Sequence, residues 1–225
     1  ILTVSSYYYI DPVSSHISGT TISAVSGRVV KLDGSGSQLV GFTITSGNAS
    51  AGSGIHASDS VNIANCIITG NSTSSEGSGA GVYCAAISEV TISNTTISSN
   101  SLSGGGVGAG IYAGTSATLT VVSSTITGNS ITGIEGKGAG IYGEASTIIS
   151  LDSTMVKTNS ITGINAKGAG VYSIGSTLGV SNSEISENTI SSSDPTGHLT
   201  SYNLTFTNCG ATGRNGPSQS DCNSA

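Results

Sequence analysis

The stretch Gly79-Ala80-Gly81-Val82-Tyr83 decides how this chain folds, because close copies of it return at a fixed spacing. The copies stand at 108–112, 138–142 and 168–172, 29 or 30 residues apart. A looser copy, Gly52-Ser53-Gly54-Ile55-His56, precedes them. A period of this length predicts a solenoid, in which each repeat packs only on its neighbours.

A second mark keeps the same period, since one Asn closes a short apolar segment in every repeat. These residues are Asn71, Asn100, Asn129, Asn159 and Asn188. We predict that they stand at an inward turn, where their amides bond to the coils above and below and satisfy turn backbone groups. Asn48 resembles an earlier member of this column after a shorter coil.

Short apolar runs lie between the two marks and alternate with a period of two. Val90 and Ile92 stand two residues apart, Ile97 follows, and every repeat has equivalents at these positions. This alternation is typical of strands, and Ser, Thr, Asn and Gly between the runs are typical of turns. We therefore predict an all-β chain that forms a right-handed, single-stranded parallel β-helix. It would have about three strands per coil and six or seven coils of roughly 27–30 residues.

Three segments follow from this pattern. Residues 1–50 are expected to form an N-terminal cap and the first irregular coils. Residues 51–200 hold the regular repeats. Residues 201–225 are a C-terminal segment that follows the repeats.

Composition narrows the classes of function. The chain has 225 residues and a net charge of −6, and only 8% of its residues are charged. The acidic balance and the absence of a basic patch argue against nucleic acid as a partner. No stretch is apolar enough to span a membrane, and nothing in the sequence points to a cofactor. Low charge, many hydroxyls and four cysteines favour an extracellular or cell-surface location.

Two cysteines, Cys66 and Cys84, fall at inward positions of neighbouring coils. They are either bonded to each other or two buried thiols, because the sequence does not fix the pairing.

The C-terminal segment resembles a known extracellular module. Its pattern, Cys-Gly-Ala-x-Gly-x-x-Gly-Pro-x-Gln-x-x-Cys over 209–222, is similar to the start of the glycine-rich region of the anaplastic lymphoma kinase and leukocyte tyrosine kinase receptors. This resemblance implies a disulfide between Cys209 and Cys222. It also implies that residues 201–225 lead into a further, glycine-rich domain of a longer protein.

The repeats resemble those of right-handed parallel β-helix proteins in the pectate-lyase-like superfamily. Their Gly-Ala-Gly-Ile/Val-Tyr and Ile-Thr-Gly-Asn motifs are closest to the repeats of polymorphic outer-membrane adhesins. The resemblance implies the fold, but this fold hosts lyases, hydrolases, adhesins and structural spikes.

An enzyme of this fold would need clustered carboxylates. Here the acidic residues scatter over different faces, and Glu184 with Glu187 is the best cluster, which we interpret as a solvated edge. We therefore predict no catalytic residues. The three histidines are not spaced as metal ligands, so we predict no metal site.

A column of aromatic residues is the candidate binding face. Each follows an inward Ile or Val and should point outward, where stacked rings could bind sugars or a partner subunit, or could form a structural ladder under the neighbouring loop. The column comprises His56, Tyr83, Tyr112, Tyr142 and Tyr172.

Four N-glycosylation sequons begin at Asn48, Asn71, Asn94 and Asn203. Asn94 aligns with an outward corner and Asn203 lies past the coils, so these two are the better candidates. A glycan at Asn48 or Asn71 would displace the asparagine column.

These patterns favour a non-catalytic, glycosylated subunit of an extracellular fibre or coat. It would associate with itself or with neighbouring domains of the same longer protein. The alternative is an adhesin or glycan-binding module, and a polysaccharide lyase or hydrolase is the third hypothesis.

Overall fold

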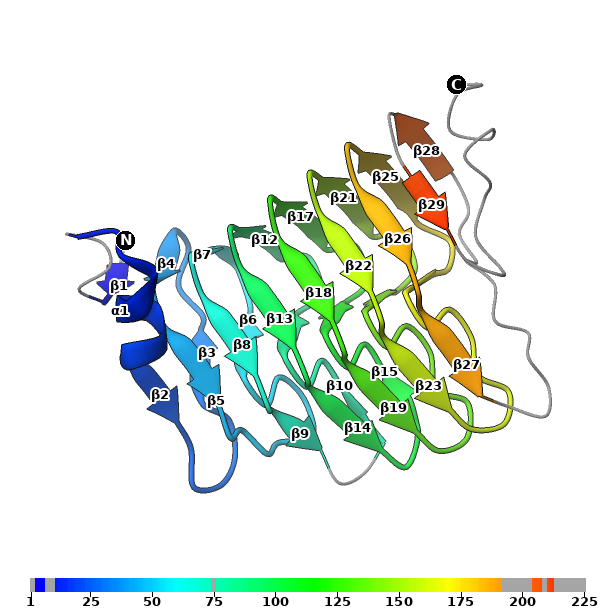
Figure 1. The fold of residues 1–225 in the computed structure, drawn as a ribbon, viewed down its shortest axis with the longest axis horizontal. Helices are drawn as coiled ribbons and strands as arrows, with labels where there is room; N and C mark the ends of the chain where they lie inside the picture. The colour runs from blue at the N-terminus through cyan, green and yellow to red at the C-terminus, as the bar shows by residue number, and fades with distance from the viewer. Residues whose placement is uncertain (1–2, 7–10, 74–75, 192–203, 208–209, 213–225) are drawn as a thin grey trace.

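The protein is a right-handed parallel β-helix, as the repeat predicts (Figure 1). A computed structural model describes residues 3–6, 11–73, 76–191, 204–207 and 210–212. All pairings between strands in these ranges are parallel. Stacked strands form long sheets along the axis, and the sheet that contains the Tyr motif has six strands, so the solenoid has about six turns.

Four long sheets and one short sheet run along the solenoid. The first sheet contains β1 (Thr3–Ser5), β4 (Ser37–Val40), β7 (Ser60–Ala64), β12 (Glu89–Ser93), β17 (Thr118–Val122), β21 (Ile148–Asp152), β25 (Thr177–Ser181) and β28 (Leu204–Thr207). The second contains β2 (Thr21–Ser23), β5 (Thr43–Thr45), β8 (Ile67–Thr69), β13 (Thr96–Ser98), β18 (Thr125–Thr127), β22 (Met155–Lys157), β26 (Glu184–Ser186) and β29 (Gly210–Thr212). The third contains β9 (Ser72–Thr73), β14 (Ser101–Ser103), β19 (Ser130–Thr132), β23 (Ser160–Thr162) and β27 (Thr189–Ser191). The fourth contains β3 (Val30–Leu32), β6 (Ile55–Ala57), β11 (Val82–Cys84), β16 (Ile111–Ala113), β20 (Ile141–Gly143) and β24 (Val171–Ser173), and the short sheet pairs β10 (Gly77–Ser78) with β15 (Gly106–Val107).

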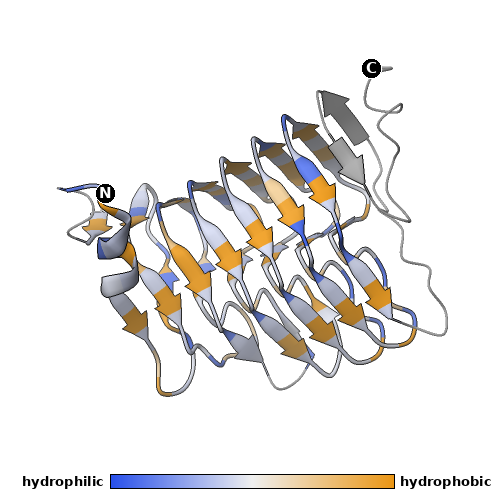
Figure 2. Cartoon of the chain, viewed as in Figure 1, coloured by the Kyte–Doolittle hydropathy of each residue, from blue (hydrophilic) through white to orange (hydrophobic). Residues whose placement is uncertain are grey.

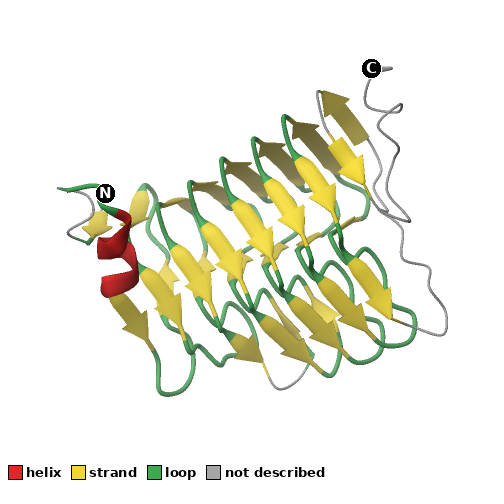
Figure 3. Cartoon of the chain, viewed as in Figure 1, coloured by secondary structure: helices red, strands yellow, loops and turns green. Residues whose placement is uncertain are grey.

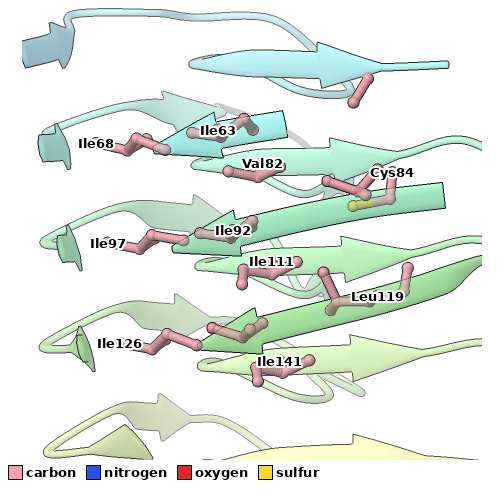
Figure 4. Close-up of a cluster of buried hydrophobic side chains, with 14 of the residues drawn as sticks. Ile63, Ile68, Val82, Cys84, Ile92, Ile97, Ile111, Leu119, Ile126 and Ile141 are labelled. Carbon is pink, nitrogen blue, oxygen red and sulfur yellow. The ribbon is translucent and has the colours of Figure 1, made fainter. Parts of the chain in front are cut away.

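The inward residues of the fourth, first and second sheets form one continuous core. Along β12, Val90 and Ile92 are buried between exposed or half-buried neighbours, and Ile97 is the buried centre of β13. Figure 2 shows the apolar residue at the centre of the strands, and Figure 4 shows the stacked side chains. Burial of each such side chain is worth about 1.5–3 kcal/mol, so the stacked core makes a large favourable contribution to the free energy of folding.

Each regular turn has four strands rather than the three that the sequence predicts. The additional strands form the third sheet, and they lie in segments that the pattern assigns to loops. Their single inward residues, such as Leu102, Ile131 and Ile161, pack with the Ala of each Gly-Ala-Gly motif in a second buried cluster. The sequence pattern assigns these strands to loops, because each follows the asparagine turn directly and the inward position of the first, Thr73, is not apolar.

The N-terminal turns differ from the regular ones. The one helix among the described residues, α1 (Ser14–Gly19), lies over the start of the second sheet, where the Thr43 hydroxyl donates to the Ile17 carbonyl at 3.0 Å (Figure 3). The third sheet begins only at β9, so the first turns lack its strand.

Candidate functional site

The predicted asparagine column is a continuous hydrogen-bonded ladder. Asn100 is completely buried, and its Nδ2 donates to Asn129 Oδ1 and to the Ile68 carbonyl, both at 3.0 Å. Its backbone N–H donates to the same Oδ1 at 3.1 Å. The same arrangement joins Asn71 to Asn100, Asn129 to Asn159 and Asn159 to Asn188. Each amide therefore links three successive turns.

The second glycine of each Gly-Ala-Gly motif makes room for this ladder. A Cβ on Gly81 would lie 2.5 Å from the Gly110 carbonyl oxygen and 3.0 Å from Asn100 Nδ2. Gly81 and Asn100 meet between the two buried clusters, since Ala80 packs in the second cluster and Val82 packs in the main one. The third position of the motif is therefore glycine because the backbone contacts the asparagine across the interior.

Asn48 is not a member of the ladder, contrary to the expectation from sequence. Its side chain is exposed, and its backbone lies in register with Ser72. The partner of Asn71 in this coil is the backbone N–H of Gly47, which donates to Asn71 Oδ1 at 2.9 Å. The shorter first coil shifts Asn48 by one residue, and one residue is enough to turn a side chain outward.

The aromatic column forms a second ladder on the outer face of the fourth sheet. His56, Tyr83, Tyr112 and their equivalents lie in register on adjacent strands. Successive ring centroids are 4.9, 4.7, 5.6 and 5.7 Å apart, with interplanar angles of 18°, 11°, 7° and 13°. Tyr112 and Tyr172 are buried, and the other rings are half-buried. Within the column each ring stacks on its neighbours, so the three inner tyrosines offer a ligand mainly their edges and hydroxyls.

Glu144 lies beside this ladder, and the sequence analysis missed it. Burial raises the pKa of Tyr112, and the negative charge of the nearby Glu144 carboxylate raises it further. Burial and the same carboxylate also raise the pKa of Tyr142. Thr115 holds Glu144 through a 2.8 Å hydrogen bond from its hydroxyl to Oε2. Strand alternation is the signal that could have revealed it, because Glu144 stands two residues after Tyr142.

The N-terminal end of the aromatic column carries positive charge. Lys31 lies in register with His56 and pairs with Asp33 at 2.8 Å, and Arg28 donates to the Ala51 and Gly52 carbonyls at 2.8 and 3.1 Å. Burial lowers the pKa of His56, and the Arg28 and Lys31 charges lower it further. These effects favour the neutral form of the His56 ring, which stacks on Tyr83.

Cys66 and Cys84 are two buried free thiols, which is one of the two alternatives that the sequence leaves open. Cys66 stands at the turn before the second sheet, and its backbone N–H donates to Thr95 Oγ1 at 3.2 Å. Cys84 stands in the fourth sheet, in register with Ala57 and Ala113. The two thiols belong to different side-chain columns, which explains why they do not bond.

Several predicted sites lie outside the described residues: Asn203, Cys209 and Cys222. Among the described acidic residues, Glu184 and Glu187 are exposed. Within the described ranges, His, Cys, Asp and Glu form no group of three or more that could hold a metal ion. No helix in those ranges has the length and apolar character needed to cross a bilayer.

The comparison with known families agrees with this architecture. A family model described as a right handed beta helix region matches residues 7–166. No curated protein and no solved structure matches the chain. The matched range covers well over half of the 225 residues and contains most of the turns described above. The chain therefore belongs to the family of right-handed β-helix regions.

Proposed function

We propose that this chain is a non-catalytic structural protein, a rigid rod subunit of an extracellular or cell-surface fibre or coat. The observation that carries the proposal is that the repeated polar and aromatic residues contact their equivalents in neighbouring turns. The asparagines bond along the axis from turn to turn, and the tyrosines stack along the same axis. These are the side chains that distinguish the repeat, and their contacts hold the rod together.

The ladders favour stiffness. Each buried asparagine amide replaces bonds to water with bonds to two neighbouring turns, and a buried amide without partners would cost about 1–3 kcal/mol. Each aromatic pair adds about 0.5–1.5 kcal/mol beyond the area that it buries. Because both ladders run through the same turns, bending the rod would disturb both at once.

The outer surface and the ends of the solenoid favour an extracellular location and association with identical subunits. Outward positions of the third sheet carry hydroxyls without charges, as at Ser101, Ser130 and Thr132. Solenoid ends present strand edges, which invite association with another chain. A contact between unlike ends does not close on itself, so it would extend into a filament.

An adhesin or glycan-binding module is the second candidate. Tyr83 and Tyr142 are only half-buried, so their edges remain accessible on one face. The stacked ring faces weigh against sugar binding by stacking, because a sugar would have to bind at edges and hydroxyls.

Electron microscopy of the purified native protein tests the proposal. We expect filaments or ordered layers with an axial repeat of a few nanometres, since six turns at about 4.8 Å span roughly 3 nm. Dispersed particles that bind a glycan array, with binding lost in Tyr142→Ala and kept in Ser130→Ala, would favour the adhesin instead. Cleavage of polygalacturonate by the purified chain would refute the non-catalytic role.

A further inference from the structure

Three of the four sequons lie among the described residues. Their asparagines differ in burial and in whether the side-chain amide is hydrogen-bonded within the fold. Asn71 is completely buried, and its Nδ2 donates to the Ile44 carbonyl at 3.1 Å and to Asn100 Oδ1 at 3.0 Å. A Cβ on Gly54 would lie 2.9 Å from that nitrogen. The folded protein therefore has no room for a saccharide on Asn71.

Asn94 has the opposite environment. It is exposed at the corner between β12 and β13, in the left-handed region with φ of 47°. Its amide nitrogen donates to none of the described residues, whereas the equivalent Asn182 donates to Asp152 Oδ1 at 2.9 Å. The next residue along this corner, Ser123, is small. A saccharide on Asn94 would extend into solvent and break no contact.

Asn48 resembles Asn94 rather than Asn71. Its side chain is exposed, and its structural role is carried by the backbone, which exchanges two hydrogen bonds with Gly27 at 3.1 and 2.7 Å. Ser50, which completes the sequon, is also exposed. The reason to doubt Asn48 was its supposed place in the ladder, and Gly47 holds that place.

We propose that Asn48 and Asn94 carry N-linked oligosaccharides in the folded protein and that Asn71 carries none. The inference rests on the proposed extracellular location, because N-linked oligosaccharides are added in the secretory pathway. They are added while the chain is still unfolded, so all three sequons are exposed to transfer. A chain modified at Asn71 cannot close its ladder, so folding itself selects the unmodified form. Asn48 follows β5 and Asn94 precedes β13, so the two oligosaccharides would flank the second sheet at opposite ends of its strands.

Expression in a eukaryotic secretory host tests this selection. Protein from medium and cells is pooled and divided into a protease-resistant and a protease-sensitive fraction. Each fraction is then analysed by glycopeptide mass spectrometry. In the resistant fraction we expect oligosaccharide at Asn48 and Asn94 and none at Asn71, with any occupied Asn71 confined to the sensitive fraction. Ser50→Ala and Thr96→Ala each remove one sequon without changing its asparagine, and each should reduce the mass by one oligosaccharide.

An oligosaccharide on Asn71 in resistant material, or an empty Asn94 or Asn48 there, overturns the proposal. The readout is independent of the proposed rod function. Material that forms filaments but lacks these oligosaccharides refutes this inference alone, whereas glycosylated material that stays dispersed refutes the fibre alone.

Discussion

Replacing Asn129 with alanine removes the central rung of the asparagine ladder. The side chain is completely buried and takes part in four hydrogen bonds. Its Oδ1 accepts two from Asn100, and its Nδ2 donates to the Ile97 carbonyl and to Asn159 Oδ1. All four are 2.9–3.1 Å long. Alanine can replace none of them.

The cost follows from the groups left behind. The backbone N–H and one amide hydrogen of Asn100 lose their acceptor, and the Ile97 carbonyl loses a donor. Asn159 Oδ1 keeps the backbone N–H of residue 129 at 3.0 Å. With about 1–3 kcal/mol for each buried group that loses its partner, we expect a loss of about 4 kcal/mol. This is a large part of the roughly 5–15 kcal/mol that stabilises a typical domain.

Urea unfolding followed by circular dichroism measures this loss. We expect the midpoint for Asn129→Ala to fall by roughly a quarter or more, on the scale of that total stability. Ser130→Ala is the matched control, because the adjacent hydroxyl points outward, and its free energy of unfolding should stay within about 0.5 kcal/mol of the parent value. Equal shifts in the two variants would refute the reasoning that the ladder, rather than general packing, stabilises the solenoid.

Three further predictions concern other parts of the ladders and core. Gly110→Ala places a Cβ 2.5 Å from the carbonyl oxygen of the equivalent glycine in the next turn, so we expect a loss of about 3 kcal/mol, read from the same urea midpoint. Burial and the Glu144 carboxylate raise the pKa of Tyr112 in the folded protein. The protonated phenol therefore contributes its full stabilisation of the fold below its unfolded pKa of about 10. This stabilisation is lost as the pH rises through the higher pKa of the folded state. Glu144→Gln should lower that pKa, and an unchanged alkaline absorbance titration would contradict the assignment. Burial raises the pKa of Cys66 and raises that of Cys84 to about 12, so neither should be alkylated at mild alkaline pH until urea unfolds the chain, and rapid labelling of the folded protein would count against this core.

The sequence by itself determined the solenoid, its parallel stacking and much of its ladder. The 29- or 30-residue spacing places equivalent residues above one another, and alternation places Val90 and Ile92 in the core. The side-chain period of a strand is two, so the inward and outward positions follow once the repeats are aligned. The asparagine column was predictable for the same reason, because its spacing equals that of the turns.

Only the tertiary structure decided the positions of residues in segments where the repeat period is absent or broken. The third sheet was hidden because its strands follow the asparagine turn directly and the inward position of the first, Thr73, is not apolar. Asn48 was misplaced because the first coil is shorter, and a shift of one residue exchanges an inward side chain for an outward one. Cys66 and Cys84 are 18 residues apart, which is less than one turn, so they occupy different side-chain columns.

The role of the tyrosines was also decided in three dimensions. Spacing shows that they line one face, but the orientation of each ring depends on its neighbours in the turns above and below. The rings stack on one another, so ring faces that could have received a sugar are occupied by the neighbouring rings within the column. A repeated sequence fixes which residues meet along the axis, whereas the packing between turns determines which of their surfaces remain free.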